Sequence, residues 1–64
     1  MGGLRKLIRT RDKDKETIVV LYHLPHNEGT PWVTWLARKD APNGTFLGHY
    51  FENVVDAVHD FDNR

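Results

Sequence analysis

The segment TIVVLYHLP, residues 17–25, is the stretch that decides the fold of this chain. Isoleucine, valine and tyrosine favour strands, and proline ends a strand because it has no N–H group to offer a neighbour. The apolar run inside the segment, residues 18–22, is five residues long, whereas a membrane-spanning helix needs about 20. We therefore predict a β-strand over residues 17–24, in a chain without a membrane span.

Two further strands are predicted on the C-terminal side of this segment. WVTWLAR, residues 32–38, and TFLGHYF, residues 45–51, are rich in aromatic and apolar side chains. Between them lies Pro42-Asn43-Gly44, a turn signal, because asparagine and glycine adopt positive φ at little cost. The connections are short, so the three strands are expected to form an antiparallel meander.

A helix is predicted to follow the last strand and to begin after Asn53. Asparagine is a favoured N-cap residue, and Asp56 stands three positions later. Apolar residues then recur with helical spacing and form one stripe: Val54, Ala57, Val58 and Phe61. Asp60 and Asp62 oppose the helix dipole near the end of this segment, so we expect its last turn to fray.

Residues 1–16 differ from the rest of the chain in charge. They hold six basic and three acidic residues, a local charge of +3, whereas residues 52–64 carry −3. A strand over residues 5–11, followed by a polar turn into the strand over residues 17–24, is the favoured interpretation. A short helical turn through Leu4, Leu7 and Ile8 is the alternative.

Length and composition limit the class of protein further. The 64 residues are expected to form a single domain, residues 1–64, in which residues 1–16 are a basic N-terminal segment. Its predicted class is α+β: a small antiparallel meander of three to four strands, with one C-terminal helix packed on one face. Nine basic residues balance nine acidic ones and there is no cysteine, which disfavours both a strongly basic nucleic-acid binder and a disulfide framework. With no signal-peptide pattern visible, we expect a cytoplasmic protein.

The face of the sheet that the helix covers bears directly on function. Alternation along the strands yields a wholly apolar set, which we expect under the helix: Val33, Trp35 and Ala37, with Ile18, Val20 and Tyr22. The other face would then expose a candidate interface formed by Val19, Leu21, Trp32 and Leu36. Such a face would expose more contiguous apolar surface than is usual for a face in contact with solvent, which is typical of an interface. In the alternative, the N-terminal segment or the loop over residues 25–31 covers it.

Candidate catalytic and metal-binding residues are few. His23 and His26 flank Pro25 at a strand end, where their side chains diverge, and no second pair has the spacing that a four-ligand zinc site needs. The chain has no serine or cysteine to act as a nucleophile. Carboxylates accompany histidine only on the predicted helix, at Asp56, His59 and Asp60. We therefore expect no enzymatic activity, no metal site and no cofactor.

Two short motifs carry a resemblance. The run Trp32-Val33-Thr34-Trp35, then Gly48-His49-Tyr50-Phe51, then an acidic helix ending near Phe61, resembles small uncharacterised αβ proteins of bacterial and phage genomes. The resemblance covers about residues 32–61 and implies a fold and a bacterial or phage setting, but no mechanism and no catalytic residues. Gly48 itself indicates a place in a strand where a neighbouring side chain approaches the backbone closely.

Two functions follow as hypotheses. The first is a small non-enzymatic protein-interaction module whose partner is another protein or a second copy, as in a homodimer. The alternative is a nucleic-acid-binding protein that uses an open aromatic sheet face and four basic residues: Arg5, Lys6, Arg9 and Arg11. The three acidic residues among the basic ones disfavour the alternative. Neither hypothesis involves a membrane or a small-molecule substrate.

Overall fold

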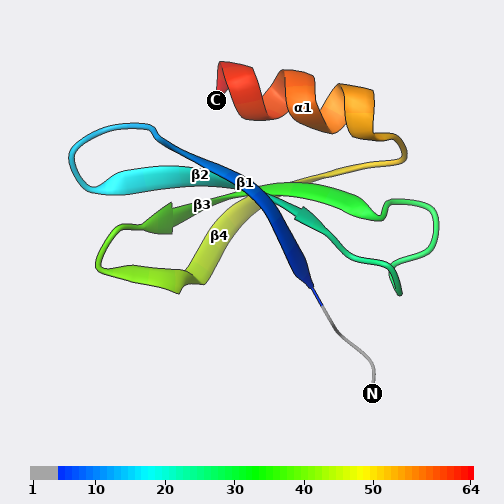
Figure 1. Ribbon diagram of the computed structural model, residues 1–64, viewed down its shortest axis with the longest axis horizontal. Coiled ribbons are helices and arrows are strands. Elements are labelled where there is room, and N and C mark those ends of the chain that lie inside the picture. Colours follow the sequence, from blue (N-terminus) through cyan, green and yellow to red (C-terminus); the bar gives the residue numbers. More distant parts are fainter. Residues whose placement is uncertain (1–4) are drawn as a thin grey trace.

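A computed structural model of the chain describes residues 5–64 and contains one sheet and one helix (Figure 1). The strands are β1 (Lys6–Asp12), β2 (Thr17–His23), β3 (Trp32–Arg38) and β4 (Ala41–Phe51), and the helix is α1 (Val54–Asn63). All neighbouring strands pair antiparallel in the order β1-β2-β3-β4. The predicted α+β class is confirmed. The N-terminal segment contains a strand rather than a helical turn, while residues 1–4 lie outside the described residues.

The turn between β3 and β4 lies earlier than the sequence predicted. Arg38 pairs with Ala41, so the chain reverses at Lys39 and Asp40. The predicted turn residues, Pro42 to Gly44, lie inside β4, where the register shifts between the pairs Ala37–Thr45 and Arg38–Ala41. A proline is tolerated there because β4 is an edge strand, which leaves part of its backbone unpaired. The predicted direct pairing of the two strands is nevertheless confirmed.

Both ends of α1 are tied down by side chains. The Asn53 side chain accepts a hydrogen bond from the Asp56 backbone N–H at 2.9 Å, as predicted for the N-cap. At the other end, the Arg11 Nε–H donates to the Phe61 carbonyl at 2.8 Å, and the Lys13 ammonium donates to the Arg64 carbonyl. Cations at a helix C-terminus interact favourably with its dipole. The fraying expected from the two aspartates is therefore countered by basic residues from the other end of the sequence.

The helix covers the face opposite to the one expected. The core beneath the helix contains residues of β2, of β3 and of the inner side of α1: Val19, Leu21, Leu36, Ala57 and Phe61. The expectation was wrong because it placed the wholly apolar set under the helix, whereas the set that the helix covers includes polar Thr34. Thr34 is fully buried, yet it finds hydrogen-bond partners on α1 and at Arg64. A polar residue can lie in a core when its hydrogen bonds are satisfied there.

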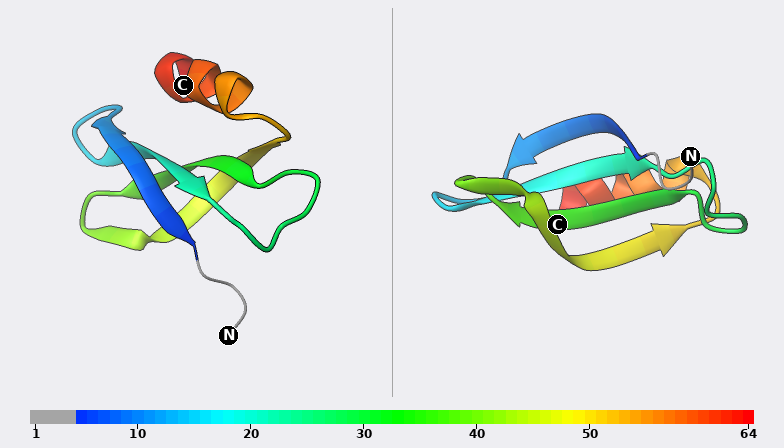
Figure 2. Two further views of the ribbon diagram at one scale, coloured as in Figure 1. Left: turned by 45° about the vertical axis from the view of Figure 1, so that its right-hand side comes forward. Right: turned by 90° about the horizontal axis from the view of Figure 1, so that it is seen from below.

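The other face is covered by the sheet itself. Figures 1 and 2 show that the start of β1 and the first half of β4 both bend away from α1. The Arg5 Nη2–H donates to the Asn43 carbonyl at 3.4 Å and links these two edges. Val20, Tyr22 and Val33 are buried here, so the sheet has a second, smaller core on the side away from the helix.

Candidate functional site

The structure places the sequence-predicted interface inside the protein. Val19, Leu21 and Leu36 are at most 8% exposed and belong to the core beneath α1. Trp32 packs against the same core and stacks on the His23 ring, with 4.3 Å between the centroids. These four residues therefore do not form a free surface in the described chain. The predicted interface is wrong because each of these residues lies on the side of the sheet that the helix covers.

The basic residues of the alternative hypothesis do not all lie on one face of the sheet. Arg11 lies against the end of α1, with its guanidinium carbon 5.7 Å from the centre of the Phe61 ring. Arg5 lies on the opposite face of the sheet, over Tyr22. Lys6 and Arg9 are exposed on β1. Lys6, Arg9 and Arg11 pair with His23, Leu21 and Val19 on the helix side, whereas Arg5 lies on the other face, so the four cations do not form one patch.

A polar cluster lies between β3, β4 and α1. The Thr34 hydroxyl donates to Asp60 Oδ2 at 2.5 Å, and His49 Nδ1 lies 3.1 Å from the same oxygen. Arg64 donates to both the carbonyl and the hydroxyl oxygen of Thr34, at 3.0 and 3.2 Å. Partial burial by itself raises the pKa of the Asp60 carboxyl, but the hydrogen bonds from Thr34 and His49 and the nearby charges hold that pKa below its ordinary value.

The geometry of this polar cluster fits a clamp for the helix. The Thr34 hydroxyl donates to a carboxylate but has no exposed surface, so a substrate cannot reach it as it would reach a nucleophile. Each of the four side chains instead joins two elements across the helix–sheet boundary. Sequence spacing gave no signal of this cluster, because Thr34 and Asp60 are 26 positions apart.

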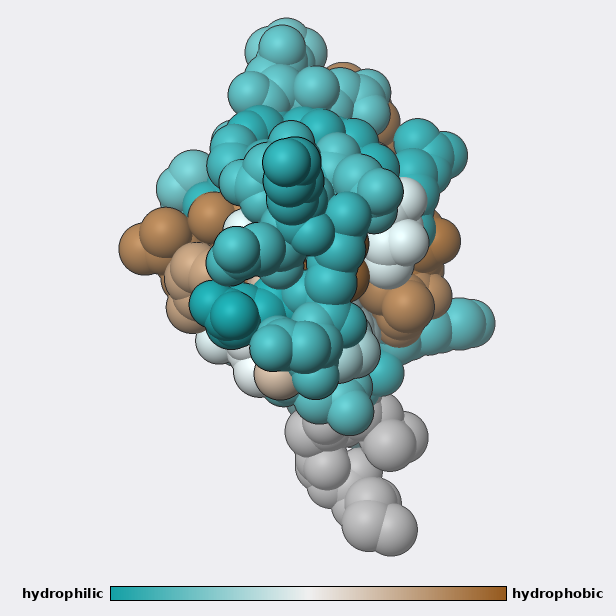
Figure 3. All heavy atoms as spheres, turned by 90° about the vertical axis from the view of Figure 1, so that its left-hand side faces the viewer, coloured by the Kyte–Doolittle hydropathy of each residue, from teal (hydrophilic) through white to brown (hydrophobic). Residues whose placement is uncertain are grey.

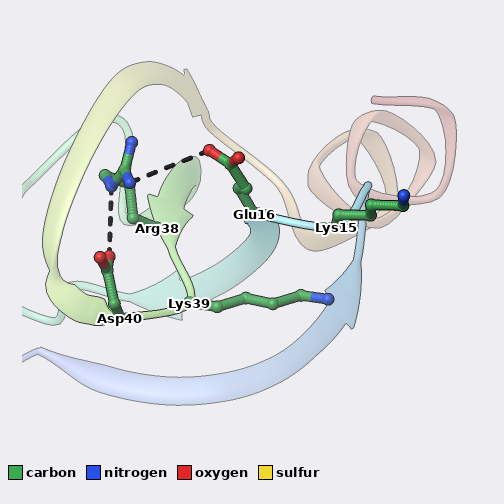
Figure 4. Close-up of a pocket in the computed structure, with 5 residues that line it drawn as sticks. All are labelled: Lys15, Glu16, Arg38, Lys39 and Asp40. Carbon is green, nitrogen blue, oxygen red and sulfur yellow. Dashed lines mark hydrogen bonds and ion pairs between the residues drawn. The ribbon is translucent and has the colours of Figure 1, made fainter.

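A charged hollow lies at the end of the sheet where β2 begins and β3 ends (Figure 4). Its volume is about 300 Å³ and it is lined by Lys15, Glu16, Arg38, Lys39 and Asp40. Arg38 pairs with Asp40 at 3.2 Å and with Glu16 at 3.9 Å, and Lys39 pairs with Asp12 at 3.3 Å. The hydrogen bond to Asp40 and the two carboxylate charges raise the pKa of the Arg38 guanidinium. Arg38 is thus paired with both carboxylates that line the hollow, and Lys39 is paired with a carboxylate outside the lining.

Three aromatic rings gather on the sheet face away from the helix, one from each of three strands. Tyr22 on β2, Trp35 on β3 and Tyr50 on β4 form what we call the aromatic face. The Tyr22 and Trp35 centroids are 5.4 Å apart at 65°, and those of Trp35 and Tyr50 are 6.2 Å apart at 87°. Edge-to-face packing of this kind is a favourable arrangement of aromatic rings. The register fixes it, because Val33 pairs with both tyrosines.

Gly48 makes room for this arrangement. A Cβ atom added at Gly48 would lie 2.5 Å from Trp35 Nε1 and 3.2 Å from a ring carbon of Tyr50. The strand is irregular at the same point, since the register shifts between Thr34 and Leu36 and the neighbouring Leu47 has a φ of 52°. Trp35 therefore packs onto bare backbone of β4. This bears out the sequence-based interpretation of Gly48 as a site of close approach.

The aromatic face retains accessible apolar surface. Tyr50 is 49% exposed, Trp35 is half-buried, and Leu7, which pairs with Tyr22, is 50% exposed. Figure 3 shows hydrophobic side chains on both flanks of an otherwise hydrophilic side of the molecule. The exposed large apolar side chains of the edge strands are Leu7 and Ile8 on β1, and Phe46, Leu47 and Tyr50 on β4. Within the sheet, the exposed large apolar side chains thus belong to the two edge strands.

Comparison with known proteins assigns no relationship. No protein-family model, no curated protein and no solved structure matches the chain. The resemblance to bacterial and phage αβ proteins therefore stays a prediction. Among residues 5–64, no group of three or more His, Cys, Asp and Glu side chains is placed to hold a metal ion, and no helix is long and apolar enough to cross a membrane.

Proposed function

We propose that the protein is a small, non-enzymatic protein-interaction module that binds a segment of another protein on its aromatic face. The observation that carries the proposal is the convergence of Tyr22, Trp35 and Tyr50 on the face that α1 leaves uncovered, with Trp35 and Tyr50 still partly accessible. Tyrosine and tryptophan are enriched at the centres of protein interfaces, because they bury a large area and lose little side-chain freedom.

The polar groups of the molecule support a non-enzymatic role. The polar cluster of Thr34, His49, Asp60 and Arg64 is used to hold α1 on the sheet. In the charged hollow at the end of the sheet, both lining carboxylates are paired with Arg38. Neither place combines an accessible nucleophile with a neighbouring base, which acyl or group transfer would need.

Charge favours a different protein over a second copy as the partner. A two-fold pair places the same surface of both subunits face to face. On the aromatic face such a pair would bring the Arg5 side chains of the two copies towards one another, because each lies over its own Tyr22 ring. Like charges facing each other oppose association. A partner segment without a cation at that point, or one that displaces Arg5, avoids this cost.

Site-specific photo-crosslinking tests the proposal. Tyr50 is replaced by benzoyl-phenylalanine, which keeps an aromatic ring, and the matched control carries the same group at Val55, which is 73% exposed on α1. Irradiation in the cells that make the protein should yield a discrete adduct from position 50, absent from position 55 and weakened by Trp35→Leu. Equal adducts from both positions, or none from position 50, would contradict the proposal. An adduct of twice the chain mass would replace the foreign partner by a second copy.

A further inference from the structure

We infer that the aromatic face recognises an arginine side chain of the partner protein, and that Arg5 of the chain itself occupies this site in the free protein. The inference rests on the proposed function and names the chemistry of the partner. The guanidinium carbon of Arg5 lies 4.9 Å from the centre of the Tyr22 ring and 5.3 Å from that of Trp35. Both distances are within the range of about 6 Å over which a ring attracts a cation.

The geometry around Arg5 is that of a site for a flat cation. Trp35 meets Tyr22 at 65° and Tyr50 at 87°, so the rings stand as walls at steep angles to one another. The Asn43 carbonyl accepts a hydrogen bond from Arg5 Nη2 at the start of β4, which adds an acceptor beside the rings. A guanidinium is planar, weakly hydrated and rich in donors, so it can stack on a ring and donate to a carbonyl at once. An ammonium group does this less well.

Arg5 is held more loosely than the other arginine that contacts an aromatic ring. Arg11 donates to the Phe61 carbonyl at 2.8 Å and is anchored within β1. Arg5 precedes β1, is exposed, and makes a single longer hydrogen bond of 3.4 Å. Among residues 5–64 it also has no carboxylate within ion-pair distance. An incoming arginine can therefore replace Arg5 without breaking an ion pair.

Occupation by Arg5 has a measurable consequence for affinity. A site that is filled from within binds an outside ligand only in the fraction of molecules in which it is open. Removing Arg5 should therefore strengthen the binding of an arginine peptide. Since a partly exposed cation–ring contact is weak, we expect a gain of about two- to fivefold.

The test uses the full chain and three short peptides. The probes are acetyl-Gly-Arg-Gly-amide, its lysine analogue and its citrulline analogue, which keeps the shape of arginine without the charge. Binding is followed by NMR through the indole N–H signals, because Trp35 lies on the aromatic face and Trp32 lies on the helix side as an internal control. The arginine peptide should shift the Trp35 signal and leave Trp32 unchanged, with weaker effects of lysine and none of citrulline.

The Arg5→Ala chain supplies the second arm, with Arg9→Ala as the matched control because Arg9 is an exposed arginine of β1. Arg5→Ala should bind the arginine peptide about two- to fivefold more tightly, and Arg9→Ala should bind it as the unaltered chain does. If Arg5→Ala does not fold, displacement is measured in the unaltered chain through the Arg5 Nε–H signal, which should move as the peptide binds.

Three results would overturn the inference. They are no Trp35 shift with the arginine peptide in either chain, equal shifts with the citrulline peptide, and equal affinity of the Arg5→Ala and unaltered chains. If the position-50 adduct forms but these tests fail, the proposed function stands and only the recognition of arginine is contradicted. If neither the adduct nor the binding of the arginine peptide is observed, both the proposed function and the inference are contradicted.

Discussion

The two faces of the sheet are both covered, but by different means. On the helix side, α1 brings apolar side chains and a set of hydrogen bonds, and Phe61 is 1% exposed. On the aromatic side, the sheet closes over itself through its bent edges and a single arginine, and Tyr50 remains about half exposed. A 64-residue chain can thus bury the centre of one sheet face under a helix while the other face stays only lightly covered. Stability should therefore depend on the first face and binding on the second.

Truncation of one large aromatic residue on each face should reveal the largest difference between the two faces. Phe61→Ala removes a buried ring and should lower the free energy of unfolding by about 3–5 kcal/mol, which is comparable to the whole stability of a domain this small. Tyr50→Ala removes a ring that is already half exposed and should cost about 1 kcal/mol. Urea unfolding followed by circular dichroism measures both. Equal losses would mean that the two faces contribute alike.

Much of the fold could be predicted because short segments of sequence determine it. Residues 17–23 and 32–38 form strands through their own composition, and Asn53 caps the helix through a contact only three positions away. The face that the helix covers depends instead on long-range contacts. Thr34 is acceptable beneath α1 only because Asp60 and Arg64 meet it there, 26 and 30 positions later. No local pattern contains that information.

The faces on which the β4 side chains lie could not be predicted for a related reason. Strict alternation along β4 would put Phe46 and His49 on opposite faces of the sheet. The irregularity at Leu47 inserts a residue, so Phe46 pairs with Leu36, His49 pairs with Thr34, and both lie on the helix side. Only Gly48 hinted at this disturbance. The predicted interface was wrong because the helix covers the face of the sheet that was expected to be open. Tyr50 lies on the other face and stays available for contact.

A substitution at Gly48 should disturb the aromatic side alone. Gly48→Ala would place a methyl group 2.5 Å from Trp35 Nε1, so the indole must move, at a cost of about 1–3 kcal/mol. The Trp35 indole N–H signal should shift strongly in an NMR spectrum, while that of Trp32 stays in place. Gly44→Ala is the control, because its nearest neighbour is 3.4 Å away. A strong shift of Trp32 would show that the two faces are coupled through the sheet.

The N-cap gives a smaller effect, which belongs to the helix side. Asn53→Ala removes the acceptor of the Asp56 N–H and should lower the free energy of unfolding by about 1 kcal/mol. Denaturant unfolding of the two chains gives the difference. Asn53→Asp, which can accept the same hydrogen bond, should restore most of the loss. A loss with aspartate as large as that with alanine would contradict the capping role.

The smallest effect is expected from acid. The pKa of Asp60 is lower in the folded chain than its ordinary value, so the unfolded chain takes up this proton first as the pH falls. The resulting stabilisation is complete above the ordinary aspartate pKa of about 4 and is lost as the pH falls through the folded value. Thermal unfolding between pH 6 and pH 2 should show this loss.

Asp60→Asn should flatten part of that acid dependence. The matched control is Asp14 in the β1–β2 turn. The backbone N–H groups of Glu16 and Thr17 donate to its carboxylate and lower its pKa. An Asp14→Asn chain should keep the contribution of Asp60. An unchanged acid profile in Asp60→Asn would mean that the polar cluster does not depend on the carboxylate charge.

The contacts of β1 with the end of α1 have a consequence for how the molecule assembles. Each hairpin of the meander joins residues that are close in sequence, so it can form with little loss of chain entropy. The contact from Arg11 to the Phe61 carbonyl spans 50 positions and closes a loop around nearly the whole sequence. The contacts of Arg11 and Lys13 with the helix end therefore form only when the first strand is already in place. In kinetic terms, the sheet forms from local steps, and the slowest native contacts are those that join the two ends of the described chain.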